Sequence, residues 1–203
     1  MRPVIVATGL ALTMTLAGCS SDDGHQAAPK TSTSTSSSTS TTTVTSTTTT
    51  TTAPCNFTGT TAPQQNALAS ETQYLTDVTA VPNGCVDVLT FTFRGSAAVE
   101  PSYQIAYEPG PFTNTAGQEV RPAGTAFLKI RFEPAWIADL GQESAPKTYT
   151  GPTEITPTGT HVVRGLALYD ANEGVVGWVA GIDGQRPFRV EPSAGHVVIT
   201  IGP

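Results

Sequence analysis

The sequence predicts an all-β domain, a sandwich or a barrel of short strands, in the part of the chain that follows about residue 66. Apolar and polar residues alternate there with a period of two, as in Leu89–Phe93, rather than with the helical period of 3.6. Glycine and proline are frequent, at 19 and 16 residues, and charged residues make up only 13% of the chain. This composition favours short strands joined by turns over long charged helices.

The alternation predicts seven strands, and turn-forming residues separate them. Pro82–Gly84 is a turn signal after the first strand, and Asp170–Gly174 is rich in turn formers between two others, which predicts a hairpin. Only Pro134–Leu140 suggests helix, of about one turn, because proline can open a helix and Gly141 can close it. The expected strands are Tyr74–Val81, Leu89–Phe93, Tyr103–Tyr107, Leu128–Phe132, Val162–Tyr169, Val175–Ile182 and Val197–Ile201.

The first 53 residues contain no aromatic residue, so we expect no packed core in them. Thr31–Thr52 is Ser or Thr at every position except Val44. Such a tract cannot bury enough apolar surface to offset the entropy of ordering, so residues 19–54 are expected to be a disordered Ser/Thr-rich linker. We interpret it as a spacer that lifts the domain off a membrane. Ser/Thr-rich stalks of exported proteins are often glycosylated, and the sequence leaves that open here.

Residues 1–18 have the features of an export signal. Arg2 precedes the apolar stretch Val4–Ala17, which is shorter than the roughly 20 residues that a membrane-spanning helix needs. The stretch ends in Leu16-Ala17-Gly18-Cys19, which resembles a bacterial lipobox. That resemblance implies that Cys19 is acylated and that the protein is lipid-anchored at the extracellular face of the cell membrane; the alternative is an ordinary signal peptide. Two acyl chains would be needed, because one alone binds a membrane only marginally.

Cys55 and Cys85 remain as a pair in an exported chain, which predicts a disulfide; the alternative is two free thiols. The bond would close a loop of about 30 residues, worth roughly 3–4 kcal/mol. We treat residues 55–65 as an N-terminal extension to the domain. No metal site is predicted, because no CxxC motif and no cluster of Cys and His is present.

Motifs of catalysis are missing from the sequence: no GxSxG, HExxH, GxGxxG or P-loop pattern occurs. His161 and His196 each stand at the start of an expected strand without a local partner. We therefore predict no enzyme and no cofactor, with a cell-wall hydrolase as the alternative if a cleft gathers either histidine with carboxylates. The net charge of −6 argues against nucleic-acid binding, which needs a basic face.

Four residues near turns are candidates for ligand binding: Tyr149, Trp178, Asp183 and Arg186. An aromatic ring beside charged and amide groups can stack on a sugar ring while those groups bond its hydroxyls. The alternative is that Trp178 is a core residue and that Asp183 and Arg186 form a salt bridge that fixes their loop. The sequence does not decide between the two.

Several segments together resemble the AMIN-like domain of actinobacterial lipoproteins and secreted proteins. They are Leu75–Val78, Val88–Phe93, Thr148–Pro152, Gly177–Gly184 and Arg186–Val190. The resemblance covers about residues 66–203 and implies a β-sandwich. The related AMIN domains of amidases and secretins bind peptidoglycan and help to place proteins in the envelope, so the resemblance implies cell-envelope binding.

We therefore expect a non-enzymatic envelope lipoprotein whose domain binds cell-wall glycan or peptidoglycan. The alternative is a protein-protein interaction module of an envelope complex, which would need an exposed apolar patch. The charges before residue 53 cancel, so the whole −6 belongs to the domain. An acidic domain is a poor general binder of anionic wall polymers, so binding would have to be local, through a groove.

Overall fold

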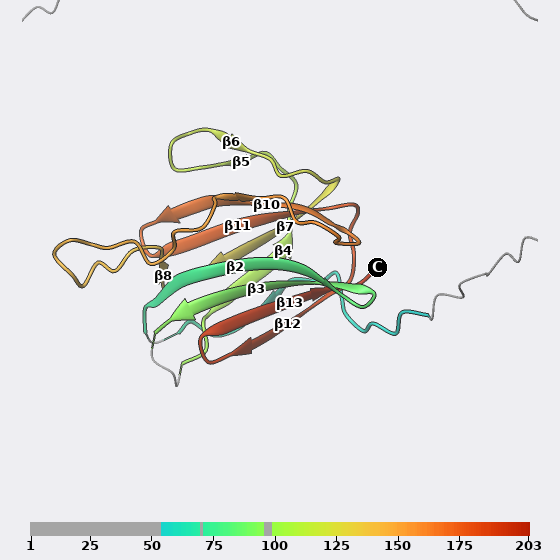
Figure 1. Ribbon diagram of the computed structural model, residues 1–203, viewed down its shortest axis with the longest axis horizontal. Helices are drawn as coiled ribbons and strands as arrows, with labels where there is room; N and C mark the ends of the chain where they lie inside the picture. Colours follow the sequence, from blue (N-terminus) through green and yellow to red (C-terminus); the bar gives the residue numbers. More distant parts are fainter. Residues whose placement is uncertain (1–53, 70, 96–98) are drawn as a thin grey trace, which may run out of the picture. The chain divides into compact units, whose positions relative to one another are not determined.

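A computed structural model describes residues 54–69, 71–95 and 99–203. Every regular element in these residues is a β-strand, so the all-β prediction is confirmed (Figure 1). The described ranges accordingly contain no helix long and apolar enough to cross a membrane. The expected signal peptide, the linker up to residue 53 and Cys19 lie outside them.

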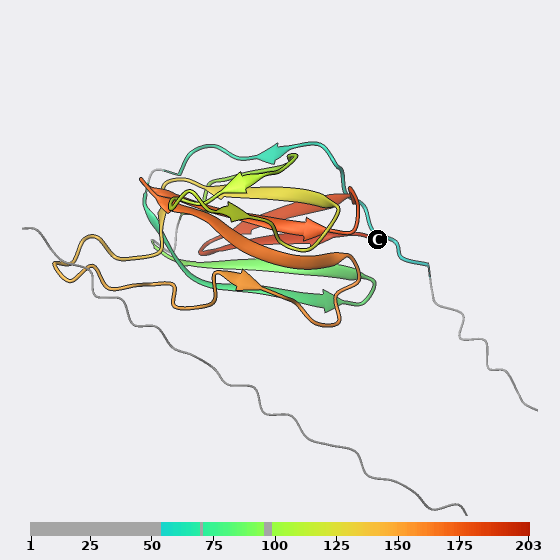
Figure 2. The same cartoon turned by 90° about the horizontal axis from the view of Figure 1, so that it is seen from above.

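The strands form two stacked sheets and one small hairpin (Figures 1 and 2). The first sheet has the order β1 (Gln64–Gln65), β4 (Tyr103–Tyr107), β7 (Ala126–Phe132), β11 (Val175–Ile182), β10 (Val163–Asn172) and β9 (Glu154–Ile155). The second has the order β12 (Phe188–Ser193), β13 (His196–Ile201), β3 (Val86–Arg94), β2 (Gln73–Asn83) and β8 (Ala135–Trp136). The hairpin consists of β5 (Phe112–Thr113) and β6 (Glu119–Val120).

The seven strands expected from alternation correspond to β2, β3, β4, β7, β10, β11 and β13. The predicted hairpin is the antiparallel pair β10–β11, in which Leu168 lies opposite Trp178. The sequence missed β12 and the two-residue strands β1, β5, β6, β8 and β9.

The expected helical turn at Pro134–Leu140 is wrong. Ala135–Trp136 is strand β8, which runs parallel to the start of β2. Its backbone groups bond to distant segments: the amide of Ala135 donates to the carbonyl of Gly174 at 2.7 Å, and the carbonyl of Pro134 accepts from the amide of Gln73 at 3.1 Å. These long-range partners replace the bonds that a helix would have made within itself.

The core fills the space between the two sheets. Phe91 and Phe132 lie at its centre with ring centroids 4.9 Å apart, and Phe93 contacts Phe132 at the same separation. Trp178, which like Phe132 belongs to the first sheet, completes this cluster, with its ring 6.3 Å from that of Phe91 in an edge-to-face arrangement. Aromatic residues from both sheets therefore hold the sandwich together.

Strand β11 is buried on both faces. Trp178 and its alternate neighbours face the inter-sheet core, whereas Val179 faces outward into a second, smaller cluster. Phe112 and Val120 of the β5–β6 hairpin cover that outer cluster. The hairpin thus forms a partial third layer over the first sheet (Figure 1).

The residues before β2 connect both sheets. The predicted disulfide between Cys55 and Cys85 is present and ties the start of the described chain to the β2–β3 turn. Thr60 then exchanges two backbone hydrogen bonds with Phe188 of β12, at 3.0 and 2.8 Å. Gln64–Gln65 continues as β1 on the edge of the first sheet. This extension is therefore packed into the domain.

Candidate functional site

A well-formed hollow lies beside the β5–β6 hairpin. It has a volume of about 610 Å³. Its walls come from Tyr107–Phe112, Glu119–Arg121, Thr125–Phe127 and Gly184–Gln185. We call it the hairpin pocket. Its volume falls within the range of about 300–1,000 Å³ that is usual for small-ligand sites.

Two glycines allow the segment that follows β6 to lie flat on the first sheet. A Cβ on Gly181 of β11 would overlap the carbonyl group of Ala123, and one on Gly165 of β10 would come within 3.3 Å of the Ala123 amide nitrogen. Gly124 itself adopts a φ of 144°, which side-chain-bearing residues rarely adopt. This close approach sets the position of the hairpin and hence the width of the pocket.

Tyr107 holds the β11–β12 loop against the pocket. Its hydroxyl donates to the carbonyl of Arg186 at 2.8 Å and accepts from the amide of the same residue at 2.9 Å. Burial raises the pKa of the Tyr107 hydroxyl, and the backbone bond to Arg186 lowers it to a smaller extent. The ring also packs edge-to-face on Phe188, at 5.9 Å. The loop therefore has a fixed position, with Gly184 and Gln185 forming part of the wall.

Asp183 and Arg186 are paired with each other, at 3.0 Å, and Asp183 also pairs with Arg164 at 3.2 Å. The structure thus has the salt bridge that was the alternative reading of these two residues. Neither residue lines the hairpin pocket. The loop predicted from the sequence does reach a pocket, but through the two residues that lie between the charged ones.

Trp178 and Tyr149 lie in the core, with 0% and 4% of their surface exposed. Their rings pack edge-to-face at 5.8 Å, and the Tyr149 hydroxyl donates to the carbonyl of Pro152 at 2.7 Å. Neither ring has an open face on which a sugar could stack. The burial of both rings contradicts the prediction that they bind a ligand, and Trp178 stands at an inward-facing position of β11, with Val179 facing outward.

The hairpin pocket combines aromatic rings with charges of both signs. Tyr107, Phe112 and Phe127 supply the rings, and Glu119 and Arg121 the charges. Among the described residues neither Glu119 nor Arg121 takes part in an ion pair, whereas Glu108 is paired with Lys129 at 2.9 Å. The Arg121 guanidinium lies over the Phe127 ring, 6.0 Å from its centre. The aromatic side chains can pack against the ring of a bound ligand, and the charged side chains can form hydrogen bonds with the polar substituents of that ring.

A second, smaller hollow of about 180 Å³ lies on the outer face of the same sheet. Its lining comes from Pro63–Gln65 before and in β1, Gln104–Ala106 of β4, and Glu108, Lys129 and Arg131. We call it the outer groove. Glu108 lines both hollows, so they lie next to each other on this sheet.

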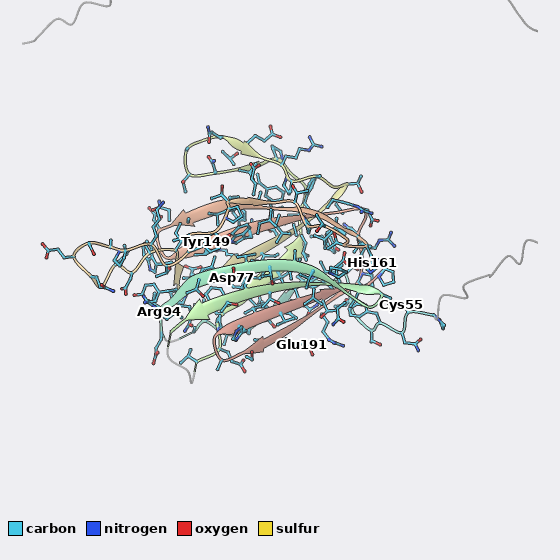
Figure 3. All side chains as sticks on the ribbon, in the orientation of Figure 1. Cys55, Asp77, Arg94, Tyr149, His161 and Glu191 are labelled. Carbon is cyan, nitrogen blue, oxygen red and sulfur yellow. A yellow bond between two sulfur atoms is a disulfide. The ribbon has the colours of Figure 1, made fainter. Side chains whose placement is uncertain are left out.

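The two histidines of the domain are not gathered with an acid in either hollow. The His161 ring donates from Nε2 to the carbonyl of Gly84 at 2.9 Å, near Cys55 at one end of the sandwich (Figure 3). His196 is the first residue of β13, where it lies opposite Thr92. The last residue of β13, Ile201, lies opposite Asp87, whose carboxylate accepts the His161 amide. The two histidines are therefore near opposite ends of β13. These two ends lie five positions apart along β13, or about 16 Å.

Asp87 is a buried carboxylate that sequence reasoning did not single out. Its two oxygens accept the backbone amides of His161, Val162 and Val163, at 2.8, 2.7 and 2.8 Å. It therefore anchors the entry to β10 rather than activating the His161 ring.

Neither a serine–lysine pair nor a metal site is formed in the described residues. Ser144 and Lys147 have the spacing of a serine–lysine pair, which sequence reasoning also missed, but both are exposed on the long β8–β9 connection. Across the residues that the structure covers, no group of three or more His, Cys, Asp or Glu side chains could hold a metal ion.

A family model described as AMIN-like domain matches residues 73–202 of the chain. Neither the curated proteins nor the solved structures include a significant match to it. The matched range begins at β2 and ends just after β13, so it contains every strand except β1 and all the residues that line the hairpin pocket.

Proposed function

The chain belongs to the AMIN-like domain family, and from that premise we propose that it is an envelope lipoprotein whose β-sandwich binds cell-wall glycan through the hairpin pocket. AMIN-like domains are in general peptidoglycan-binding or envelope-associated modules, and binding modules rather than catalytic ones. The proposal adds an anchor, a ligand class and a site to that general role.

The observation that carries the proposal is the composition of the hairpin pocket. A sugar needs a ring surface to pack on and polar groups around it, and this pocket offers Phe127 and Tyr107 beside Glu119, Arg121 and Gln185. Neither Arg121 nor Glu119 forms an ion pair within the described part of the chain. Their donors and acceptors can therefore bind ligand oxygens and amides.

The anchor is proposed from the sequence. Acylation of Cys19 would hold the protein at the extracellular face of the cell membrane, and residues 20–54 would link the anchor to the domain. As a flexible coil, a linker of this length spans on the order of 30–35 Å. That reach would allow the domain to contact wall polymers next to the membrane.

A protein-interaction module, the alternative, would need a contiguous apolar surface. The large hydrophobic side chains most exposed in the described ranges are Leu68, Val81 and Leu140, at 70%, 49% and 51%. They lie on three different segments: before β2, near the end of β2, and in the β8–β9 connection. This distribution supports the glycan proposal over the alternative.

The direct test is co-sedimentation of the detergent-purified full chain with insoluble cell wall. We expect the protein in the pellet above the level of an unrelated β-sandwich of similar net charge. No enrichment over that control would refute the proposal. A single dominant crosslinked protein in cells, without wall binding, would instead favour the interaction module.

A further inference from the structure

The outer groove continues the hairpin pocket along strands β4 and β7. Glu108 follows the last residue of β4, and its amide bonds to the carbonyl of Phe127 in β7 at 3.0 Å. From there the groove passes Ala106 and Lys129, which lie opposite each other, and reaches Gln104 and Arg131, which are also paired. Glu108 lies four positions after Gln104, which adds about 13 Å to the length of the site.

The residues of this path all face away from the core. Ile105 and Ile130, the neighbours between the two pairs, are 1% and 0% exposed and belong to the inter-sheet core. Alternation along the strands therefore turns Gln104, Ala106 and Lys129 outward. Ala106 is the smallest of them, so it forms the floor of the groove, and Lys129 and Glu108 form one side.

The charges in the groove are already neutralised. Lys129 pairs with Glu108 at 2.9 Å, and Arg131 pairs with Glu133 at 2.7 Å. Gln65 lies opposite Gln104 in the register of β1 and β4, and both side chains are exposed. Each amide offers donors and an acceptor without net charge. The groove thus presents hydrogen-bonding groups rather than a positive field.

We infer that the hairpin pocket and the outer groove form one elongated site for an uncharged, hydroxyl- and amide-bearing linear glycan, with the pocket holding one part of the chain and the groove the sugars that follow. This inference rests on the proposed function and adds the ligand's length and charge. A polyanion is disfavoured, because both cations of the groove are paired, Arg121 in the pocket stands beside Glu119, which is equally unpaired among the described residues, and the domain carries a net charge of −6.

The test measures affinity against oligosaccharide length by calorimetry on the full chain. The probes are the disaccharide and the hexasaccharide of β-1,4-linked N-acetylglucosamine, and a hyaluronan hexasaccharide as a carboxylate-bearing chain of equal length. Two or three added hydrogen bonds predict that the neutral hexasaccharide binds about tenfold or more tightly than the disaccharide, and more tightly than hyaluronan. Equal affinity for the two neutral lengths, or tighter hyaluronan binding, would overturn the inference.

A variant that fills the groove supplies the second arm. Ala106→Phe places a ring on the groove floor, and we expect it to lower hexasaccharide affinity to near the disaccharide value. Thr79→Phe, at an exposed position of β2 in the other sheet, is the matched control and keeps the full length dependence. Unfolding curves show whether both variants are folded. If wall binding is seen but length dependence is not, the inference fails while the proposed function stands.

Discussion

Replacing Gly181 with alanine tests whether the close approach of the Pro122–Gly124 segment builds the hairpin pocket. The added Cβ would lie 2.8 Å from the carbonyl carbon of Ala123 and 3.2 Å from the carbonyl oxygen of Pro122. Carbon atoms in contact prefer about 3.5–4.0 Å, so the segment must move outward by on the order of 1 Å. Because the contacting atoms are backbone, no side-chain rotation can relieve the overlap.

The expected cost is that of overpacking, about 1–3 kcal/mol in the free energy of unfolding. For a domain of this size the thermal midpoint should fall by about 3–10 °C. The same displacement would shift the hairpin on which Glu119 and Arg121 stand, so wall binding should weaken as well. Urea unfolding and calorimetry measure the first effect, and co-sedimentation measures the second.

Gly184→Ala is the matched control for stability. Its new Cβ would have only the Nε of Arg186 within 4 Å, at 3.9 Å, so the free energy of unfolding should stay within about 0.5 kcal/mol of the parent. If Gly181→Ala were as stable as Gly184→Ala, the close approach would not determine the hairpin's position and the reasoning would be refuted.

Three other results are expected. Replacing both Cys55 and Cys85 with serine should lower the free energy of unfolding by about 3–4 kcal/mol, and the exported parent should show no alkylatable thiol at either position unless reduced. Asp87→Ala leaves three backbone amides without their acceptor and should lower the free energy of unfolding in urea by about 3–5 kcal/mol. Asp170→Ala removes one 3.2 Å bond and should lower it by about 1 kcal/mol or less. Equal losses in the two variants would contradict the anchoring role of Asp87. Burial raises the pKa of four tyrosines above the ordinary 10.0: Tyr103, Tyr107, Tyr149 and Tyr169. Because the folded state favours the protonated phenol, the free energy of unfolding should decline once the pH rises above about 10. An ordinary titration of all four phenols, followed by tyrosinate absorbance of the native protein, would contradict this expectation.

The fold could be predicted because two-residue alternation directly reflects burial on one face of a strand. In β7, Leu128, Ile130 and Phe132 face the core while their neighbours face outward. The small hairpin gave no such signal, since β5 and β6 have two residues each and present one buried side chain apiece, Phe112 and Val120. Their burial depends on a sheet formed by distant residues.

The site was harder to predict for the same reason. Strand β11 is apolar at every position, so alternation could not show that Trp178 faces inward. The hairpin pocket joins Tyr107–Phe112 to Gly184–Gln185, more than 70 residues away, through two hydrogen bonds on one tyrosine hydroxyl. No local pattern indicates such a contact. The loop of the candidates Asp183 and Arg186 reaches the pocket only through Gly184 and Gln185, because the two charged residues pair with each other.

The central claim is that the hairpin pocket binds cell-wall glycan. The most direct test measures binding isotherms on insoluble cell wall for the full chain and for two variants, Arg121→Ala and Arg189→Ala. Both arginines lie over a phenylalanine ring, at 6.0 Å from Phe127 and 5.8 Å from Phe57, but only Arg121 lines the pocket. Loss of a charge-assisted hydrogen bond predicts a wall affinity about tenfold or more lower for Arg121→Ala, with Arg189→Ala equal to the parent. Equal wall affinity for the parent and both variants, or no wall binding by the parent, would contradict the claim.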